Sequence, residues 1–120
     1  MKVPTPEQVE KMMIEKMGAL PASLNSAKAI DPAFLVEQAM SSQTSVQSPN
    51  NPLDAKTSMM LLLAVSITLG SDECIMEQTR MLKKMGATKE EIAFLVKIVK
   101  HGHSSAVMGS AKTAFDTLES

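Results

Sequence analysis

The chain has 120 residues, 44% of them hydrophobic, which fits a single domain of ordinary size. Its 12 basic and 13 acidic residues give a formal charge of -1 without a basic stripe or an aromatic platform, so nucleic acid is not expected as a partner. One cysteine cannot form an internal disulfide, the N-terminus is charged and contains prolines, and the longest apolar run, residues 59–69, is too short for a membrane helix. We therefore expect a soluble, cytoplasmic protein with no membrane partner.

The first helix is expected to begin at Thr5. Thr5 is a typical capping residue, Pro6 follows at the first helical position, and Gln8 completes a capping pattern three residues after Thr5. Apolar residues then recur at helical spacing as far as Gly18, which favours a helix end.

Two further helices are expected before residue 44, separated by a proline. A short segment after Pro21 has apolar residues three apart up to Ile30, and Asp31-Pro32 marks the start of the next helix. Three side chains of that helix are expected to be buried: Phe34, Leu35 and Met40. Residues 45–53 carry no charge and contain two prolines, which is the composition of a loop.

The second half of the chain begins with two expected helices. Asp54 can cap an apolar helix that ends at Leu69, and Gly70 suits a left-handed helix end. The next helix contains Cys74 and is expected to end at Gly86.

The last third of the chain also has a helical pattern. Thr88 and Glu91 form a capping box, after which apolar residues recur at helical spacing. Gly102 is expected to end this helix, and Ser104 or Ser105 to cap a final one. No alternating strand pattern of useful length occurs, so we predict an all-α fold of about six helices.

Methionine is unusually frequent, with 11 residues against three phenylalanines. Methionine fills irregular gaps in cores and also suits adaptable binding surfaces. Because most of the methionines fall at helical spacing, we expect them in the core, with a methionine-rich surface as the alternative.

Three motifs follow one another in a characteristic order. They are Asp54-x-Lys56 before the apolar helix, the segment Gly70–Ile75 at the next helix start, and Gly86-Ala87-Thr88-x-Glu90-Glu91-Ile92 before the following helix. In this order, and with an alanine-rich last helix, residues 54–118 resemble the carboxymuconolactone decarboxylase / alkylhydroperoxidase D-like family. The resemblance implies a helical bundle that assembles into trimers or hexamers. It makes residues 1–120 one domain, with N-terminal helices in residues 5–44 and the family core in residues 54–118.

The resemblance also implies a chemistry. The family's peroxidase branch uses a Cys-x-x-Cys pair at a helix start, a histidine on the same helix and a glutamate on the preceding helix. One thiolate attacks the peroxide, the second thiol resolves the sulfenic acid, and the other two groups move protons. Aligned with Cys74 as the second cysteine, these positions hold Ser71, Gln78 and Met59. Since none of the three can do the family's chemistry, the dithiol mechanism does not transfer.

Cys74 is the remaining candidate catalytic thiol. It lies in the first turn of its helix, where the dipole favours a thiolate, but Asp72, Glu73 and Glu77 oppose additional negative charge. The structural alternative is a small buried residue, since free cysteine is among the most buried residue types.

His101 and His103 are the candidate bases that could replace Gln78 if folding or assembly brings one of them to Cys74. The structural alternative places them at the C-terminal end of a helix, where positive character complements the dipole. A metal site is not expected, because residues two apart on a helix point in different directions and no cluster of carboxylates lies near them in the sequence.

Two functions follow from these residues. The first is a thiol-redox enzyme that acts on a peroxide or a small electrophile through Cys74 and an external thiol reductant, without a cofactor. Lactone decarboxylase activity is a sub-case for which the sequence shows no acid–base pair. The second is a non-catalytic oligomeric scaffold or small-ligand binder that has lost the redox motif.

Overall fold

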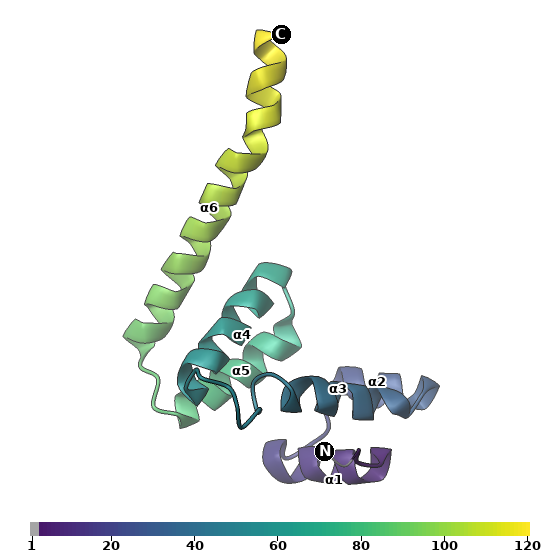
Figure 1. Ribbon diagram of the computed structural model, residues 1–120. Helices are drawn as coiled ribbons and strands as arrows, with labels where there is room; N and C mark the ends of the chain where they lie inside the picture. The colour runs from purple at the N-terminus through teal and green to yellow at the C-terminus, as the bar shows by residue number, and fades with distance from the viewer. Residues whose placement is uncertain (1–2) are drawn as a thin grey trace. The chain divides into compact units, whose positions relative to one another are not determined.

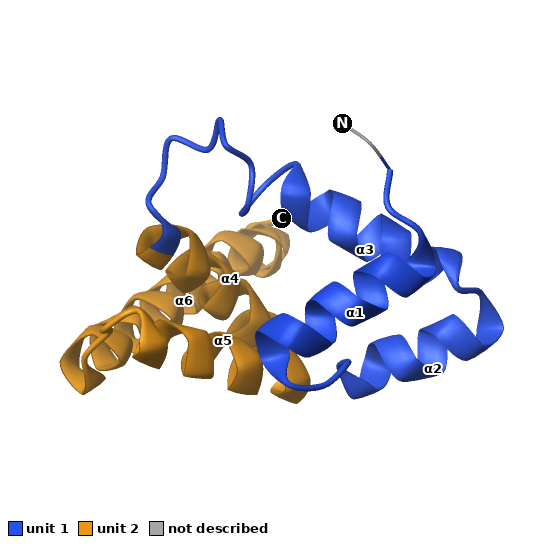
Figure 2. Cartoon of the chain, turned by 90° about the horizontal axis from the view of Figure 1, so that it is seen from below, with its two compact units in different colours: residues 1–55 blue, residues 56–120 orange. Residues whose placement is uncertain are grey.

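The computed structural model describes residues 3–120, and in this range it contains six helices and no strand. The predicted all-α fold class is therefore confirmed. Figure 1 shows the helices in chain order, and Figure 2 shows the two compact units, residues 1–55 and 56–120, into which the chain divides.

Unit 1 contains three helices: α1 (Pro6–Met17), α2 (Ala22–Ile30) and α3 (Ala33–Gln43). The predicted start of α1 is confirmed, because the Thr5 side chain accepts from the Gln8 amide while the Gln8 side chain accepts from the Thr5 amide. Gly18 ends α1 with φ 84°. That left-handed conformation costs glycine little, so this helix end depends on the residue type.

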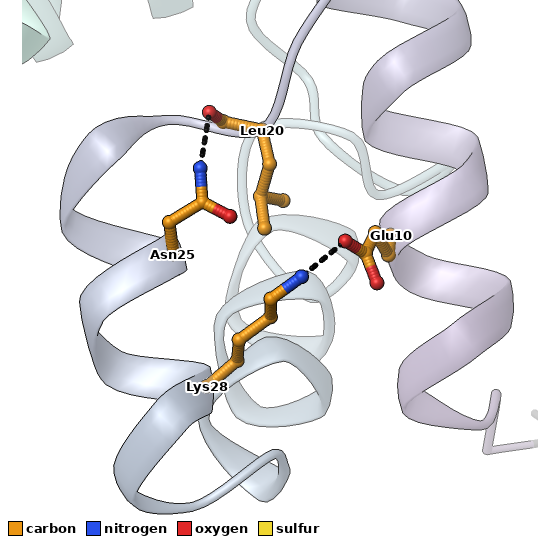
Figure 3. A network of polar contacts seen from close by, with 4 residues as sticks. All are labelled: Glu10, Leu20, Asn25 and Lys28. Atoms are coloured by element: carbon orange, nitrogen blue, oxygen red, sulfur yellow. Dashed lines mark hydrogen bonds and ion pairs between the residues drawn. The ribbon is translucent and has the colours of Figure 1, made fainter.

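The core of unit 1 lies where α1 and α2 pack on α3. Its buried residues are Val9, Leu20, Leu35 and Ala39. Figure 3 shows the polar contacts at its edge, where Lys28 of α2 pairs with Glu10 of α1 and the Asn25 amide donates to the Leu20 carbonyl at 3.4 Å. The ion pair links α2 to α1. Because both of its partners are about one third exposed, it adds little to stability.

The three burial predictions for α3 had different outcomes. Leu35 is buried, as expected, with 1% of its surface exposed. The prediction for Phe34 was wrong, because 46% of its surface is exposed. Met40 is only partly buried, so the prediction for this residue was right only in part. Adjacent helical positions point about 100° apart, so Leu35 and Phe34 cannot both face the same small core.

Unit 2 is built from α4 (Ala55–Leu69), α5 (Asp72–Lys84) and α6 (Lys89–Glu119). Gly70, at φ 74°, makes the tight turn between α4 and α5, and Gly86, at φ 86°, ends the turn region after α5. All three helices contribute to one core. Its buried residues are Leu63, Leu82, Leu95 and Val99.

The methionines do not form the fully buried core. Among residues 3–120, the buried hydrophobic side chains are valine, leucine and alanine, and Met13, Met59 and Met60 pack against the edges of the two cores. Met76 and Met108 are more than half exposed. The expectation of a methionine-filled core was therefore wrong for the centre of each unit and right only for its periphery.

The predicted break at Gly102 was also wrong. α6 runs without interruption from Lys89 to Glu119, and Gly102 does not adopt a positive φ. Glycine in a helix interior costs only about 1 kcal/mol relative to alanine, and no proline follows to force a stop. The neighbouring helix-forming residues therefore continue the helix through this position.

This continuity predicts the effect of Gly102→Ala. No atom lies within 4 Å of a Cβ built at this position, so the substitution is expected to raise the free energy of unfolding by about 0.5–1 kcal/mol. Gly86→Ala is the matched control, and it should lower stability by about 1–2 kcal/mol because of its positive φ. Urea denaturation measures both, and a destabilised Gly102→Ala protein would indicate that the helix ends at this residue.

Candidate functional site

Cys74 lies in the first turn of α5 and its thiol is free and exposed. The turn at Gly70 and the extended backbone of Ser71 start this helix, and Ser71 makes no side-chain cap. Its first-turn amides and the helix dipole are thus directed toward the region of the thiol, although Asp72 and Glu73 place negative charge in the same turn. The prediction of a buried cysteine was wrong for the single chain, because Cys74 is on the outer surface of α5.

Gln78 lies one turn after Cys74 and faces α4. Its amide is 2.7 Å from the hydroxyl of Ser66, which is buried with 6% of its surface exposed. With its nitrogen turned toward Ser66, the amide also donates to the carbonyls of Leu62 at 3.2 Å and Cys74 at 3.3 Å. Gln78 therefore joins the two helices of the hairpin and gives the buried Ser66 hydroxyl a hydrogen-bond partner.

Met59 fills the position that the resemblance gives to a glutamate. It is partly buried and packs against the apolar core of unit 2. A charged carboxylate in this apolar contact would pay a desolvation cost that methionine avoids. Met59 and Gln78 thus have structural surroundings that match their chemical types.

The two histidines lie in the middle of α6, because this helix continues to Glu119. The prediction that they mark a helix C-terminus was therefore wrong. His103 Nε2 is 2.9 Å from the hydroxyl of Thr68 in the last turn of α4, and His101 is exposed. Within residues 3–120, the hydrogen bonds that the structure contains do not join either histidine to the Cys74 thiol.

The Thr68–His103 contact is a feature that the sequence did not reveal. The two residues are 35 positions apart, and only the path of the long α6 beside the end of α4 brings them together. A histidine on the α4-facing side of a continuous helix was the available signal, and it was missed because the helix was expected to end at Gly102.

The motifs that carry the family resemblance meet at the other end of α4. The Glu91 side chain accepts from the Thr88 amide at 3.0 Å and pairs with Lys56 at 2.6 Å. Two of the three motifs are thus joined by one carboxylate. Their role in this region is to fix the start of α6 against the start of α4.

Glu91 predicts a pH dependence of stability. Its hydrogen bond to the Lys56 ammonium, helped by the Thr88 amide, holds the pKa of this carboxyl below its ordinary value of 4.5. A lowered pKa in the folded state gives stability that is present above the ordinary value and is lost as pH falls through the lowered value. We expect thermal stability to fall below about pH 4.5, and to fall less steeply in Glu91→Gln, which keeps the capping acceptor and loses the charge.

Glu90→Gln is the control for this prediction, because it removes a neighbouring charge and leaves the Lys56–Glu91 pair intact. Thermal unfolding measured from pH 7 to pH 3 compares the three proteins. Equal acid slopes for the wild type and Glu91→Gln would contradict the assignment of this dependence to Glu91.

Two further features bear on the kind of site. Among the described residues, no three side chains of histidine, cysteine, aspartate or glutamate gather in a way that could hold a metal ion. In the same part of the chain, no helix has the length and apolar character needed to cross a membrane.

Two comparisons with known proteins found sequences similar to this chain. The sequence model of the carboxymuconolactone decarboxylase family matches residues 37–114, starting within α3 and therefore earlier than the expected family core. An uncharacterized protein of Methanocaldococcus jannaschii is 46% identical over 50 residues, which make up 42% of this chain and 47% of that protein. The chain thus aligns with about half the length of this relative. Because the family match covers more than half of the sequence, including α4, α5 and most of α6, the chain belongs to the carboxymuconolactone decarboxylase family.

Proposed function

We propose that this family member is a thiol-redox protein that reduces a peroxide, or reacts with another small electrophile, through Cys74 alone. The observation that carries this proposal is the exposed, free thiol in the first turn of α5. It occupies the position of the family's second cysteine, and a small molecule in solvent can reach it. Accessibility and a helix N-terminus are two of the features that distinguish reactive cysteines from structural ones.

The proposed reaction balances with two external thiols. The Cys74 thiolate attacks one peroxide oxygen, the O–O bond breaks, and the leaving alkoxide takes up a proton to give an alcohol and a sulfenic acid. A first external thiol attacks the sulfenic sulfur, releasing water and forming a mixed disulfide, and a second external thiol releases Cys74. The peroxide is reduced and the two external thiols are oxidised to a disulfide.

The reductant must be external because the residues at the family's other catalytic positions cannot replace it. Ser71 cannot resolve a sulfenic acid, and Gln78 cannot act as a base because its amide does not titrate.

Of the two candidate bases, we favour His103 over His101. The bond to Thr68 lies beside the end of α4, and α4 leads through Gly70 into α5, the helix of Cys74.

A second candidate function is a non-catalytic helical assembly or small-ligand binder. The bond between Ser66 and Gln78 favours it, since the residue that replaces the family histidine is already engaged in structure. On this alternative, Cys74 is an exposed residue without a chemical task. Lactone decarboxylation would need a paired acid and base near Cys74, and the contacts described above do not supply such a pair.

A thiol-reactive probe distinguishes these functions. The folded wild-type protein at pH 7 should be modified faster than a short unfolded peptide that contains the Cys74 sequence. The proposal predicts faster labelling of the folded chain, because an accessible thiol in the first turn of a helix is the kind of position at which reactive cysteines occur. Labelling that is slower than in the peptide, or absent until denaturant is added, would overturn the thiol-redox proposal and favour the non-catalytic one.

We also propose that the working form is a cytoplasmic homo-oligomer, a trimer or a hexamer, as the family resemblance implies. Residues 1–120 would act as one functional domain in this assembly. The family match supports the single domain, because it crosses the boundary between the two compact units.

A further inference from the structure

Unit 2 has an open apolar groove between α4 and the first half of α6. The groove has a volume of about 360 Å³. Its apolar lining consists of Met60, Leu61, Ala64, Phe94, Leu95, Ile98 and Val99. Leu61, Phe94 and Ile98 are each more than half exposed, at 54%, 53% and 69%. Large apolar side chains that are exposed together on one surface indicate a binding site for another apolar surface.

We call the second half of α6, residues 100–119, the α6 arm; apart from the bond of His103 to Thr68 near its start, it is largely exposed in the single chain. Every residue of the arm is exposed except Ala111, which is partly buried. Figure 1 shows the C-terminal half of α6 extending beyond α4 and α5. Four apolar residues recur along it at spacings of four, three and four: Val107, Ala111, Ala114 and Leu118. This is the spacing of a helix that packs against another helix. Since most of the stability of helices in proteins comes from packing of an apolar face, this exposed stripe indicates a packing partner.

α6 forms one side of the groove and also the arm, so the distance along this helix limits which groove the arm can reach. At about 1.5 Å per residue, Leu118 lies roughly 30 Å along α6 from Ile98, so the arm cannot reach the groove of its own chain. Val107 is nine residues from Ile98, or about two and a half turns, so the two side chains point to opposite sides of α6. The arm and the groove are therefore two distinct surfaces, and every copy carries both.

We propose that the α6 arm of one copy packs into the α4–α6 groove of a second copy, head to tail. Because the two surfaces face opposite sides of one helix, the contact is heterologous and is repeated from copy to copy until a ring closes. This inference rests on the homo-oligomer proposed above, and it is independent of the chemistry of Cys74.

A helix fits this groove better than a small ligand does. Small-ligand sites enclose most of their ligand, whereas the residues that flank this groove are half exposed. The Glu91 carboxylate, the charged group in the lining, is already bound to Lys56 and Thr88 and is not available to orient a ligand. An amphipathic helix in an apolar groove needs no such group, because its contacts are apolar.

The experiment uses the full chain and size-exclusion chromatography with light scattering. Val107→Glu places a charge in the arm stripe, and Leu61→Glu and Ile98→Glu each place one in the groove. Lys112→Gln is the matched control, since it changes the net charge by the same amount on the face of the arm that carries the Lys112–Asp116 pair. The wild type and the control should be oligomers of one size, and each of the other variants should be monomeric with unchanged helix content by circular dichroism.

Mixing the variants tests the head-to-tail contact itself. Val107→Glu has an intact groove and Ile98→Glu has an intact arm, so their mixture should form a one-to-one heterodimer. A monomeric wild type would overturn both the assembly and this inference. A wild-type oligomer whose mass Val107→Glu does not change would overturn this inference alone. A mixture that stays monomeric would also overturn it, and an Ile98→Glu protein that is oligomeric on its own would show that two arms pair with each other.

Discussion

Cys74→Ser is expected to abolish thiol-dependent peroxide consumption, reducing the protein-catalysed rate to the rate of buffer and reductant alone. The physical reason is that serine cannot form a sulfenic acid, and the chain has no other cysteine to replace the lost thiol. The side chain is exposed, so the substitution should change stability by less than about 0.5 kcal/mol. Peroxide loss, followed with an excess of a small thiol, measures the rate directly.

Met76→Leu is the matched control for Cys74→Ser. Met76 is two residues from Cys74 on α5, and 53% of its surface is exposed, so it can also consume peroxide by forming a sulfoxide. That reaction is not reversed by a simple thiol, and it therefore stops after one equivalent. Continued turnover in Met76→Leu and none in Cys74→Ser is the expected pair of results. Equal rates in the wild type and Cys74→Ser would contradict a role for this thiol.

Leu63→Ala is expected to lower the free energy of unfolding by about 2–5 kcal/mol. Leu63 is 1% exposed and packs with Leu82, Leu95 and Val99, so truncation leaves a cavity where all three helices of unit 2 meet. Such a loss is a large fraction of the stability of an ordinary domain. Guanidinium denaturation followed by circular dichroism measures the change.

Leu61→Ala is the control for the core prediction, because it makes the same chemical change on the same helix. Leu61 is 54% exposed, so its truncation should cost less than about 1 kcal/mol in the single chain. If Leu61→Ala and Leu63→Ala lower stability equally in monomeric protein, then α4 does not pack with the face that the structure shows.

The helix starts and turns of this fold were predictable because they depend on local chemistry. The two capping boxes at Thr5 and Thr88, and the left-handed positions Gly18, Gly70 and Gly86, are each determined by a few neighbouring residues. Gly102 has the same residue type without the same conformation, since nothing after it stops the helix. A glycine therefore marked a helix end only where the following residues could begin a turn.

The candidate site was less predictable because it depends on contacts between distant residues. The exposure of Cys74 and the bond from His103 to Thr68 both follow from how α4, α5 and α6 pack, which no local pattern records. The substitutions at Met59 and Gln78 were visible in the sequence through the family resemblance. What the structure adds is the use each residue now has, in the apolar core and in the bond to Ser66.

The most direct test of the central claim is to trap and locate a sulfenic acid on Cys74. Wild-type protein is treated with one equivalent of peroxide in the presence of a sulfenic-acid-specific reagent and is then digested and mapped by mass spectrometry. Because methionine oxidation does not give this adduct, the 11 methionines do not interfere. We predict an adduct on the peptide containing Cys74, and its loss when a reducing thiol is added before the trap. Oxidation confined to methionines, with Cys74 recovered unmodified, would contradict the thiol-redox account.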